Sequence, residues 1–323
     1  MTKTIIESVE LEEFRGIRAC REPIPLSSFT VLIGRNNSGK TSVLEAIALI
    51  PPCDFHNMVR FTSVGWTWAG LMDRLHGGIS SLIYGYTGEG KVSYKIRGKS
   101  LEITFNTRES KVKTGEQAIT KLFGVKDEDE LMKAVLLLPN STEFLHALAN
   151  RLREEGEWAK VEKSGANVLL VRDLISKVVP DRFTDATIRF NSIVLRKELP
   201  DGRVIYIKAS DLGDGVERIL IYGLWLEAHR PKVVLWDDIE ASAHPGLIEA
   251  ALSWLASRDW QVVLTTHSYD VLERLVALEP EGASVVVLRK GPDDVLEPKR
   301  LSLDELREMM ESHVDVRRVV DII

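Results

Sequence analysis

The chain has 323 residues, of which 44% are hydrophobic and 28% charged, and its formal net charge is −6. This size and composition exclude a mainly disordered chain and fit one large α/β domain or two smaller ones. Two cysteines are too few for a framework of disulfides, and no apolar run is long enough to span a membrane. The negative net charge argues against a protein that binds nucleic acid over its whole surface. We therefore expect a cytoplasmic protein with no membrane contact.

The N-terminal segment alternates strand and helix patterns. Residues 5–11 and 29–33 are apolar runs of the kind found in sheet strands. The second run leads directly into a glycine-rich segment, 34–41, and apolar positions at helical spacing follow from residue 42 to residue 50. Two prolines then end the helix, because proline lacks a backbone N–H and restricts the residue before it. The segment predicts strand, turn and helix in immediate succession.

The middle of the chain divides into an irregular part, a hairpin and a long helical part. Residues 53–90 are rich in glycine and tryptophan and have no regular period, whereas 91–97 and 101–105 alternate as two strands. Residues 126–180 mostly favour helix, with a break at Asn140. The apolar positions of this part form two stripes, with Leu145, Leu148 and Leu152 on one and Val168, Val171, Leu174 and Val178 on the other.

The last third of the chain alternates strands and helices. A hairpin is expected from residues 187–195 and 203–208, turned at Pro200-Asp201-Gly202. The alternation after it is typical of a largely parallel sheet covered by helices. The expected helices cover residues 216–228, 246–256 and 269–277, and the expected strands cover 232–236, 261–265 and 284–289. Residues 302–305 fit the capping box of a last helix.

The segment Gly34–Thr41 fits the pattern G-x-x-x-x-G-K-[ST], with a strand before it and a helix after it. In such a loop the glycines let backbone N–H groups point at phosphate oxygens, and the helix N-terminus adds its dipole. Lys40 would place its charge at the β- and γ-phosphates, and the Thr41 hydroxyl would bind Mg²⁺. The alternative is a glycine-rich turn with a chance lysine. The pattern predicts a nucleotide site formed by Arg35, Asn36, Asn37, Ser38, Gly39, Lys40 and Thr41.

Two later strands end in polar residues suited to phosphoryl transfer. The apolar run 233–236 precedes Asp237 and Asp238. The first acid would hold the metal and its water shell, and the second would face the attacking water. The alternative is a strand with two solvated acids at its exit. The next apolar run, 262–266, ends in His267, whose place one strand after the acids favours a catalytic role over a structural one.

A glycine–acid–glycine turn precedes the helix expected at 216–228. It consists of Leu212, Gly213, Asp214 and Gly215. By itself this turn fits a helix N-cap. Its position shortly before the strand that ends in Asp237 makes it a candidate functional element as well.

These motifs together resemble the ATP-binding heads of ABC-type ATPases in the SMC, RecF and OLD group. Within that group the resemblance is closest to the stand-alone AAA-15, AAA-21 or OLD-like ATPases. Leu11–Ile17 is similar to the NFRGF-like opening strand of those heads, and Asp237–Glu240 with His244-Pro245 is similar to their DE-x-E-x-x-x-HP stretch. The motifs cover residues 1–50 and 205–290.

The resemblance implies an α/β P-loop NTPase fold of the ABC and SMC-head type, with two lobes, a mixed β-sheet and a helical insertion. It divides the chain into an N-terminal ATPase lobe at 1–125, a helical insertion at 126–180 and a C-terminal lobe at 181–323. It also implies a homodimer through ATP, in which the signature of one subunit contacts the γ-phosphate bound by the other. That signature would be Leu212, Gly213, Asp214 and Gly215.

Site roles follow from the same resemblance. ATP and Mg²⁺ are the implied cofactors, with Lys40 on the phosphates and with Thr41 and Asp237 at the metal. Asp238 occupies the position of the general base, and His267 that of the γ-phosphate switch.

The chain also departs from the family pattern. The base is normally Glu, and Asp238 is one methylene shorter, which predicts slow hydrolysis because a misplacement near 1 Å can cost about 100-fold in rate. Glu240 is the alternative base. No glutamine lies between Thr41 and Glu116, which counts against the energising subunit of a transporter. The insertion is too short for the long coiled coil of SMC proteins, and no Toprim nuclease domain is recognisable, so we expect an ATPase head without its own effector.

Residues 91–113 form a basic segment, with seven basic residues against two acidic ones. Their charge makes them candidates for contact with DNA phosphates. The alternative is the solvated face of an exposed hairpin. Tyr94 and Phe105 are expected on the buried face, so base stacking is not expected. The candidate contacts are Lys91, Lys95, Arg97 and Lys99.

The sequence therefore predicts a dimerising ATPase head that hydrolyses ATP slowly, as a switch in DNA repair or in defence against foreign DNA. Its partner would be double-stranded DNA or a separate nuclease. In the alternative, the switch controls a protein partner without touching nucleic acid, and the tryptophan-rich segment 61–68 and the helices of 126–180 form its docking surface. A transporter subunit is the least favoured reading.

Overall fold

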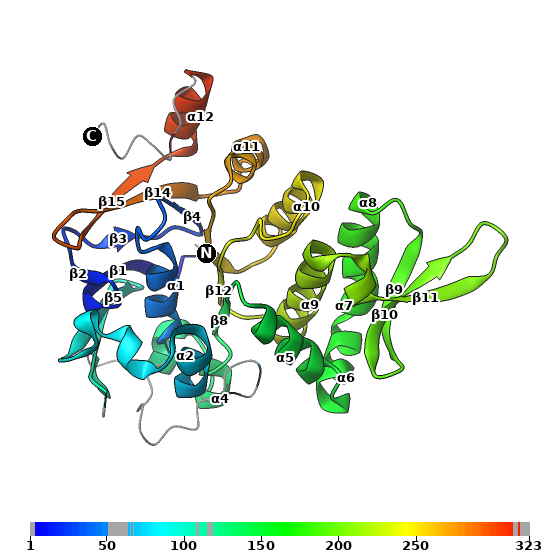
Figure 1. Cartoon of the computed structure of the whole chain (residues 1–323), viewed down its shortest axis with the longest axis horizontal. Coiled ribbons are helices and arrows are strands. Elements are labelled where there is room, and N and C mark those ends of the chain that lie inside the picture. Colours follow the sequence, from blue (N-terminus) through cyan, green and yellow to red (C-terminus); the bar gives the residue numbers. More distant parts are fainter. Residues whose placement is uncertain are drawn as a thin grey trace.

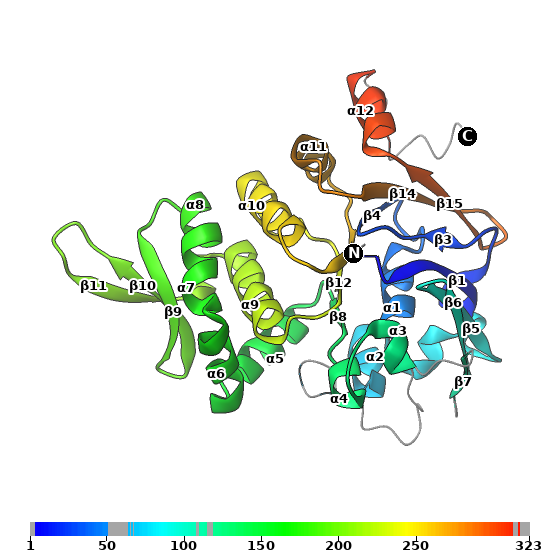
Figure 2. The same cartoon turned by 180° about the vertical axis from the view of Figure 1, so that it is seen from behind.

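Two bodies share the chain in the computed structural model (Figure 1), which describes residues 4–50, 64, 66, 68–107, 110–114, 119–312 and 316. The first body holds a large curled β-sheet around helix α1. The second holds a group of helices and a small antiparallel sheet, and it lies beyond strands β8 and β12. In Figures 1 and 2 this small sheet and the strands β5–β7 lie at opposite ends of the molecule.

The large sheet has 12 strands and is mixed, as expected. Its order is β7-β6-β5-β1-β2-β15-β14-β4-β13-β12-β8, with β3 paired to β1. The strands are β1 (Ile6–Phe14), β2 (Ile17–Cys20), β3 (Ile24–Pro25), β4 (Phe29–Ile33), β5 (Gly90–Ile96), β6 (Lys99–Phe105), β7 (Ser110–Thr114), β8 (Val135–Leu138), β12 (Val233–Trp236), β13 (Gln261–Thr265), β14 (Ala283–Lys290) and β15 (Val295–Leu301). The helices between the first eight strands are α1 (Lys40–Ala48), α2 (Trp68–His76), η1 (Ile79–Leu82), η2 (Tyr84–Tyr86), α3 (Ile119–Phe123) and α4 (Glu128–Leu131).

The parallel strands β4, β13 and β12 are buried along their whole length. Their register is close: Leu32 lies opposite Thr265, and Trp236 lies opposite both Leu264 and Leu138 of β8. Parallel strands in register end at the same edge of a sheet, so the residues that follow these strands meet there. Helix α1 begins at this edge and packs against β1, β8, β12 and β13.

Strand β8 lies in a stretch for which the sequence favours helix. It pairs in parallel with β12 and forms one edge of the large sheet. Val135–Leu138 is only 4 residues long and wholly apolar, so it shows neither a helical nor a strand period. The helix expectation for 126–180 is wrong over β8, while the lobe boundaries at residues 125 and 180 remain predictions.

The second body is built around helix α9. This helix packs against α5, α6 and α7, and the stripe of Leu145, Leu148 and Leu152 on α5 is buried as expected. The small sheet has the order β11-β10-β9. The elements are α5 (Thr142–Leu152), α6 (Glu155–Ser164), α7 (Ala166–Leu170), η3 (Val171–Ile175), α8 (Ser176–Val178), β9 (Phe183–Arg189), β10 (Ser192–Glu198), β11 (Val204–Lys208), η4 (Ala209–Leu212) and α9 (Asp214–His229).

Two local expectations for this body are wrong. Residues 187–195 are not one strand, because Phe190 and Asn191, with φ values of 52° and 55°, form a two-residue turn between β9 and β10. The apolar stripe expected from Val168 to Val178 is also broken. Residues 171–175 form a π-helix, whose wider turn shifts the helical period, and Val168 is 39% exposed.

The alternating pattern of the C-terminal part is confirmed. Helices α10 (Pro245–Ala256), α11 (Tyr269–Leu278) and α12 (Leu303–Glu311) follow β12, β13 and β15. β15 is an additional strand, antiparallel to β14, which was not predicted. Ser302 and Glu305 form both hydrogen bonds of the expected capping box at the start of α12.

Candidate active site

The loop between β4 and α1 is tightly packed at its two glycines. A Cβ on Gly34 would lie 2.4 Å from the backbone oxygen of Leu288, and a Cβ on Gly39 would lie 2.9 Å from Cδ1 of Ile17. Both residues have positive φ, 151° and 94°, which side chains rarely adopt. Glycine is therefore required at both positions by space and by backbone conformation.

The other residues of this loop divide into exposed and buried groups. Arg35, Asn36 and Asn37 are exposed, whereas Ser38 is buried and its hydroxyl oxygen has no hydrogen-bond partner within the described residues. A buried hydroxyl without a partner is unusual and suits a site that binds a polar ligand. The predicted loop thus presents an exposed polar surface together with one buried hydroxyl.

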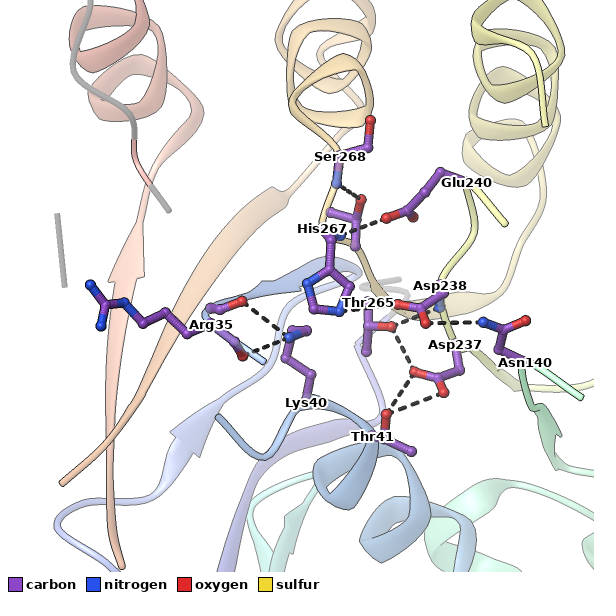
Figure 3. Close-up of polar contacts among 12 residues, drawn as sticks. Arg35, Lys40, Thr41, Asn140, Asp237, Asp238, Glu240, Thr265, His267 and Ser268 are labelled. Carbon is purple, nitrogen blue, oxygen red and sulfur yellow. Dashed lines mark hydrogen bonds and ion pairs between the residues drawn. The ribbon is translucent and has the colours of Figure 1, made fainter. Parts of the chain in front are cut away.

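Lys40 points back over its own loop (Figure 3). Its Nζ donates to the backbone oxygens of Gly34, at 3.1 Å, and Arg35, at 3.0 Å. Burial lowers the pKa of the Lys40 ammonium, while the nearby carboxylates of Asp238, Asp237 and Glu240 act in the opposite direction. Lys40 is therefore a buried cation beside three acidic side chains.

Asp237 is joined to the P-loop helix and to β13 by hydroxyl groups. The Thr41 hydroxyl lies 3.1 and 3.2 Å from the two carboxylate oxygens, and the Thr265 hydroxyl donates to Oδ1 at 2.7 Å. Burial raises the pKa of the Asp237 carboxyl to about 6, although the hydrogen bond from Thr265 opposes the shift. The Thr41–Asp237 pair predicted from the sequence is thus assembled, with oxygen atoms from both side chains close together.

Asp238 is held from three sides (Figure 3). Its backbone N–H donates to the Thr265 hydroxyl at 2.8 Å, and its Oδ2 accepts from Nδ2 of Asn140 at 3.1 Å. Its Oδ1 lies 3.6 Å from Nε2 of His267 and is buried, with no hydrogen bond from the residues that the structure describes. Asp238 has a φ of 46°, a left-handed conformation that is costly for a residue with a side chain. Its position is therefore fixed by long-range contacts and not by local preference.

Glu240 contacts the loop after β13. Its Oε1 accepts from the backbone N–H of His267 at 2.6 Å, while Oε2 is buried and has no hydrogen-bond partner in the described part of the chain. One carboxylate oxygen of Glu240 thus orients the backbone of the predicted switch residue. The three acids and His267 that the sequence singled out lie together at the carboxyl edge of β12 and β13.

Three further residues at this edge were not predicted. Thr265 joins Asp237 to Asp238, Asn140 donates to Asp238, and Arg218 of α9 donates to Oδ1 of Asn140 at 2.8 Å. A sequence signal exists for Asn140, because it is the first polar side chain after the buried run 135–138. This signal can be used only when residues 135–138 are recognised as a strand.

The predicted signature lies at the N-terminal end of α9, in the second body. Gly213 and Asp214 are exposed, and Gly213 has a φ of 94°. Gly215 is buried, and a Cβ there would lie 2.2 Å from the backbone oxygen of Ser242. Gly215 therefore serves first to let α9 approach the loop that follows Asp238.

Two of the four candidate DNA contacts are ion-paired within the chain. Lys91 pairs with Glu12, and Lys95 with Glu7 at 3.5 Å, both across from β5 to β1. Lys99, at the start of β6, is exposed. Arg97 lies in the turn before it with a φ of 47°. Tyr94 and Phe105 are buried as expected, at 3% and 1% exposure.

Trp66 is a packing residue. Its ring meets Phe144 edge-on with centroids 6.1 Å apart, and the guanidinium of Arg74 lies 4.3 Å from the ring centroid. Residues 61–63, 65 and 67 of the proposed tryptophan-rich docking segment lie outside the described residues, as does the side chain of Trp68.

Comparison with known proteins supports this reading of the fold. Residues 5–63 match the AAA ATPase domain family. An SMC head with an extended coiled coil from Pyrococcus furiosus, bound to the C-terminal domain of ScpA, is 13% identical with a TM-score of 0.58, over 96% of this chain and 99% of that one. An SMC head bound to the C-winged helix domain of ScpA is 14% identical with a TM-score of 0.60, over 93% and 99%. The SMC head domain from Thermotoga maritima is 12% identical with a TM-score of 0.52, over 93% and 100%.

These similarities establish that the chain has the fold of an SMC-like ATPase head, which confirms the predicted mixed α/β P-loop fold. No curated protein matches the chain in sequence. Among the described residues, no helix has both the length and the apolar character needed to cross a membrane.

The raised pKa of Asp237 gives a pH-dependent prediction. In the unfolded chain this carboxyl loses its proton near 3.8, and in the folded chain near 6, so folding stability falls as pH rises between these values. Asn at this position removes that loss. We expect Asp237→Asn to raise the free energy of unfolding of the nucleotide-free protein by about 1–3 kcal/mol at pH 7.5 and by little at pH 4.

Urea unfolding at the two pH values measures this effect. Asp259→Asn, at an exposed carboxyl, is the matched control and should change stability little at either pH. If Asp237→Asn raised the free energy of unfolding equally at both pH values, the raised pKa of the Asp237 carboxyl would be contradicted.

Proposed function

We propose that the protein is an ATPase whose nucleotide site is formed by Gly34–Thr41 and the acids after β12. The observation that carries this proposal is the meeting of Lys40, Thr41 and Asp237 at one sheet edge, with Thr41 hydrogen-bonded to Asp237. In P-loop NTPases a lysine and a hydroxyl in these places bind phosphate and metal, and a carboxylate at the end of the neighbouring strand completes the metal site.

The residues present suit Mg²⁺. The Thr41 hydroxyl and the Asp237 carboxylate are hard oxygen donors, and Mg²⁺ prefers one or two such protein ligands together with phosphate and water. The raised pKa of Asp237 indicates a buried carboxyl that a cation would favour in its ionised form. Bound Mg²⁺ would neutralise charge on the β- and γ-phosphates. Ser38, Gly39 and the exposed Arg35, Asn36 and Asn37 would surround the phosphate chain.

Asp238 is the better candidate for the general base. Its Oδ1 is buried, has no hydrogen bond among the described residues, and lies 3.6 Å from Nε2 of His267. Glu240 uses one oxygen to hold the backbone of His267, which favours a supporting role for that acid. An aspartate is shorter than the usual glutamate, so we expect turnover to be slow.

The homodimer through ATP is part of the proposal. Gly213 and Asp214 are exposed at the N-terminus of α9, where backbone N–H groups and the helix dipole suit an anion. In a dimer of SMC-like heads this end would contact the γ-phosphate bound by the other subunit. Gly215 is not required to contact phosphate, because its packing against Ser242 already accounts for it.

The setting proposed for this switch is DNA repair or defence against foreign DNA, with double-stranded DNA or a separate nuclease as partner. The basic segment 91–113 supports a DNA partner less than its composition suggests, since Lys91 and Lys95 are partly neutralised by Glu12 and Glu7. The same pairing favours the second candidate, a switch that controls a protein partner. Two of the SMC heads of similar fold are bound to domains of the protein ScpA.

The first prediction concerns the phosphate site. Lys40→Ala removes an ammonium group that donates to two carbonyls of the loop, and with it the charge expected at the β- and γ-phosphates. We expect ATP turnover to fall by at least about 100-fold. Steady-state phosphate release measures the turnover of the variant and of the wild type. Nucleotide affinity of the variant is compared with the binding of ADP to the wild type. Unchanged ATP affinity and turnover would refute the nucleotide site.

The second prediction concerns the dimer. Asp214→Arg places a bulky side chain at an exposed signature position and leaves the packing of Gly215 intact. We expect it to abolish ATP-induced dimers in analytical ultracentrifugation, because a long side chain would occupy the space of the other subunit's nucleotide loop. Asp129→Arg makes the same charge change at an exposed position in the first turn of α4 and is the control. ATP-induced dimers of Asp214→Arg would exclude the sandwich arrangement.

The third prediction separates the two partners. If duplex DNA is the partner, it should stimulate ATP turnover at low salt, and the effect should fade as salt rises, because phosphate contacts release counterions. Lys99→Glu should weaken the stimulation several-fold, whereas Lys133→Glu, at another exposed lysine, should not. Turnover that ignores DNA at every salt concentration would favour the protein partner.

A further inference from the structure

The amide of Asn140 bridges two elements of the site. Its Nδ2 donates to Oδ2 of Asp238 at 3.1 Å, and its Oδ1 accepts from Nη1 of Arg218 at 2.8 Å (Figure 3 shows Asn140 beside Asp238). A guanidinium only donates hydrogen bonds and a carboxylate only accepts them. Arg218 therefore fixes which end of the amide faces Asp238, and a flipped amide would lose both bonds.

Arg218 is an expensive residue for this place in the fold. It lies on α9, one turn after Gly215, and is 6% exposed. Its Nε is buried without a hydrogen bond among the described residues. Burying a guanidinium with incomplete hydrogen bonding costs stability, so packing alone does not account for an arginine here.

A second side chain of α9 contacts the same loop. The Tyr222 hydroxyl, one helical turn beyond Arg218, donates to the backbone oxygen of Pro139 at 2.8 Å. Pro139 and Asn140 directly follow β8. The helix that begins with the signature thus holds this loop through two bonds, of which only the one from Arg218 reaches the Asn140 amide.

We propose that Asn140 and Arg218 are positioning residues for Asp238, and that they link the general base to the signature helix of the same chain. This proposal rests on the proposed ATPase function. Asn140 holds Oδ2 of Asp238 and leaves Oδ1 of Asp238 to face the attacking water. Arg218 holds Asn140, so a displacement of α9 at its signature end is passed to Asp238 through two hydrogen bonds. Asp238, in its left-handed conformation, depends on such support more than a relaxed residue would.

The test compares ATP turnover and ATP affinity in a set of variants. Asn140→Ala and Arg218→Met should each lower kcat by about 10- to 100-fold, as expected when a reacting group is misplaced by a fraction of an ångström to about 1 Å. ATP affinity, measured with a fluorescent nucleotide, should change less than about threefold, since the hydrogen bonds described for the two side chains are to Asp238 and to each other. Because the two residues act in series, the double variant should be no slower than the slower single one.

Two variants separate positioning from support of the fold. Tyr222→Phe removes the bond to Pro139 but keeps the ring against Trp236, and it should retain wild-type kcat. Arg218→Lys, which can still donate to Asn140, should recover part of the activity lost in Arg218→Met. Thermal unfolding of every variant identifies any that fail to fold. The exposed Asn140 can be truncated without opening the core, so Asn140→Ala decides the matter if Arg218→Met is unstable.

Three results would overturn the proposal: wild-type kcat in Asn140→Ala, losses that multiply in the double variant, or a loss in Tyr222→Phe equal to that in Arg218→Met. Failure of the proposed function has a different signature. In that case the wild type itself would show no turnover above that of Lys40→Ala, whatever residue stands at 140 or 218.

Discussion

The arrangement of the site depends on the parallel register of β4, β13, β12 and β8. Leu32 opposite Thr265, and Trp236 opposite Leu264 and Leu138, bring four chain segments to one sheet edge. Most polar residues of the site follow one of these strands by a few residues, while Thr265 ends β13 itself and Arg218 lies on α9. A slip of one residue in any strand would turn alternate side chains to the other face and separate Asp237 from Thr41.

At that edge a few hydroxyl and amide groups arrange an excess of negative charge. Thr265 donates to Asp237 and accepts from the backbone of Asp238, so one side chain sets the spacing of two carboxylates. Lys40 is the buried cation nearest to them and is occupied by the carbonyls of Gly34 and Arg35. Burial is the main cause of the raised pKa of Asp237, and the carboxylate of Asp238 adds to it. The site therefore gives up folding stability to keep carboxylates where a metal and phosphates would meet them.

The sequence predicted those parts of the site whose residues are contiguous. The glycine-lysine loop, the two acids after 233–236 and the histidine after 262–266 each carry a local pattern, and the structure places them together. Asn140, Thr265 and Arg218 were missed because their roles depend on partners 27 to 98 positions away along the chain. Strand β8 was missed because a short leucine-rich run has no period, and with it went the signal for Asn140. The basic hairpin was overestimated for a related reason, since the pairing of Lys91 and Lys95 with β1 appears only in the sheet.

The close approach of Gly215 to Ser242 has a mechanical consequence. A methyl group at Gly215 would clash with Ser242, so the start of α9 and the loop after Glu240 pack backbone against backbone, and a displacement of one presses on the other. That loop leads back through Glu240 to the backbone of His267. A displacement of the exposed turn at Gly213 and Asp214 would thus be transmitted through contact between backbones, and side-chain rearrangement would absorb little of it. The first turn of α9 is therefore stiffly coupled to this loop, because Gly215 has no side chain between the two backbones.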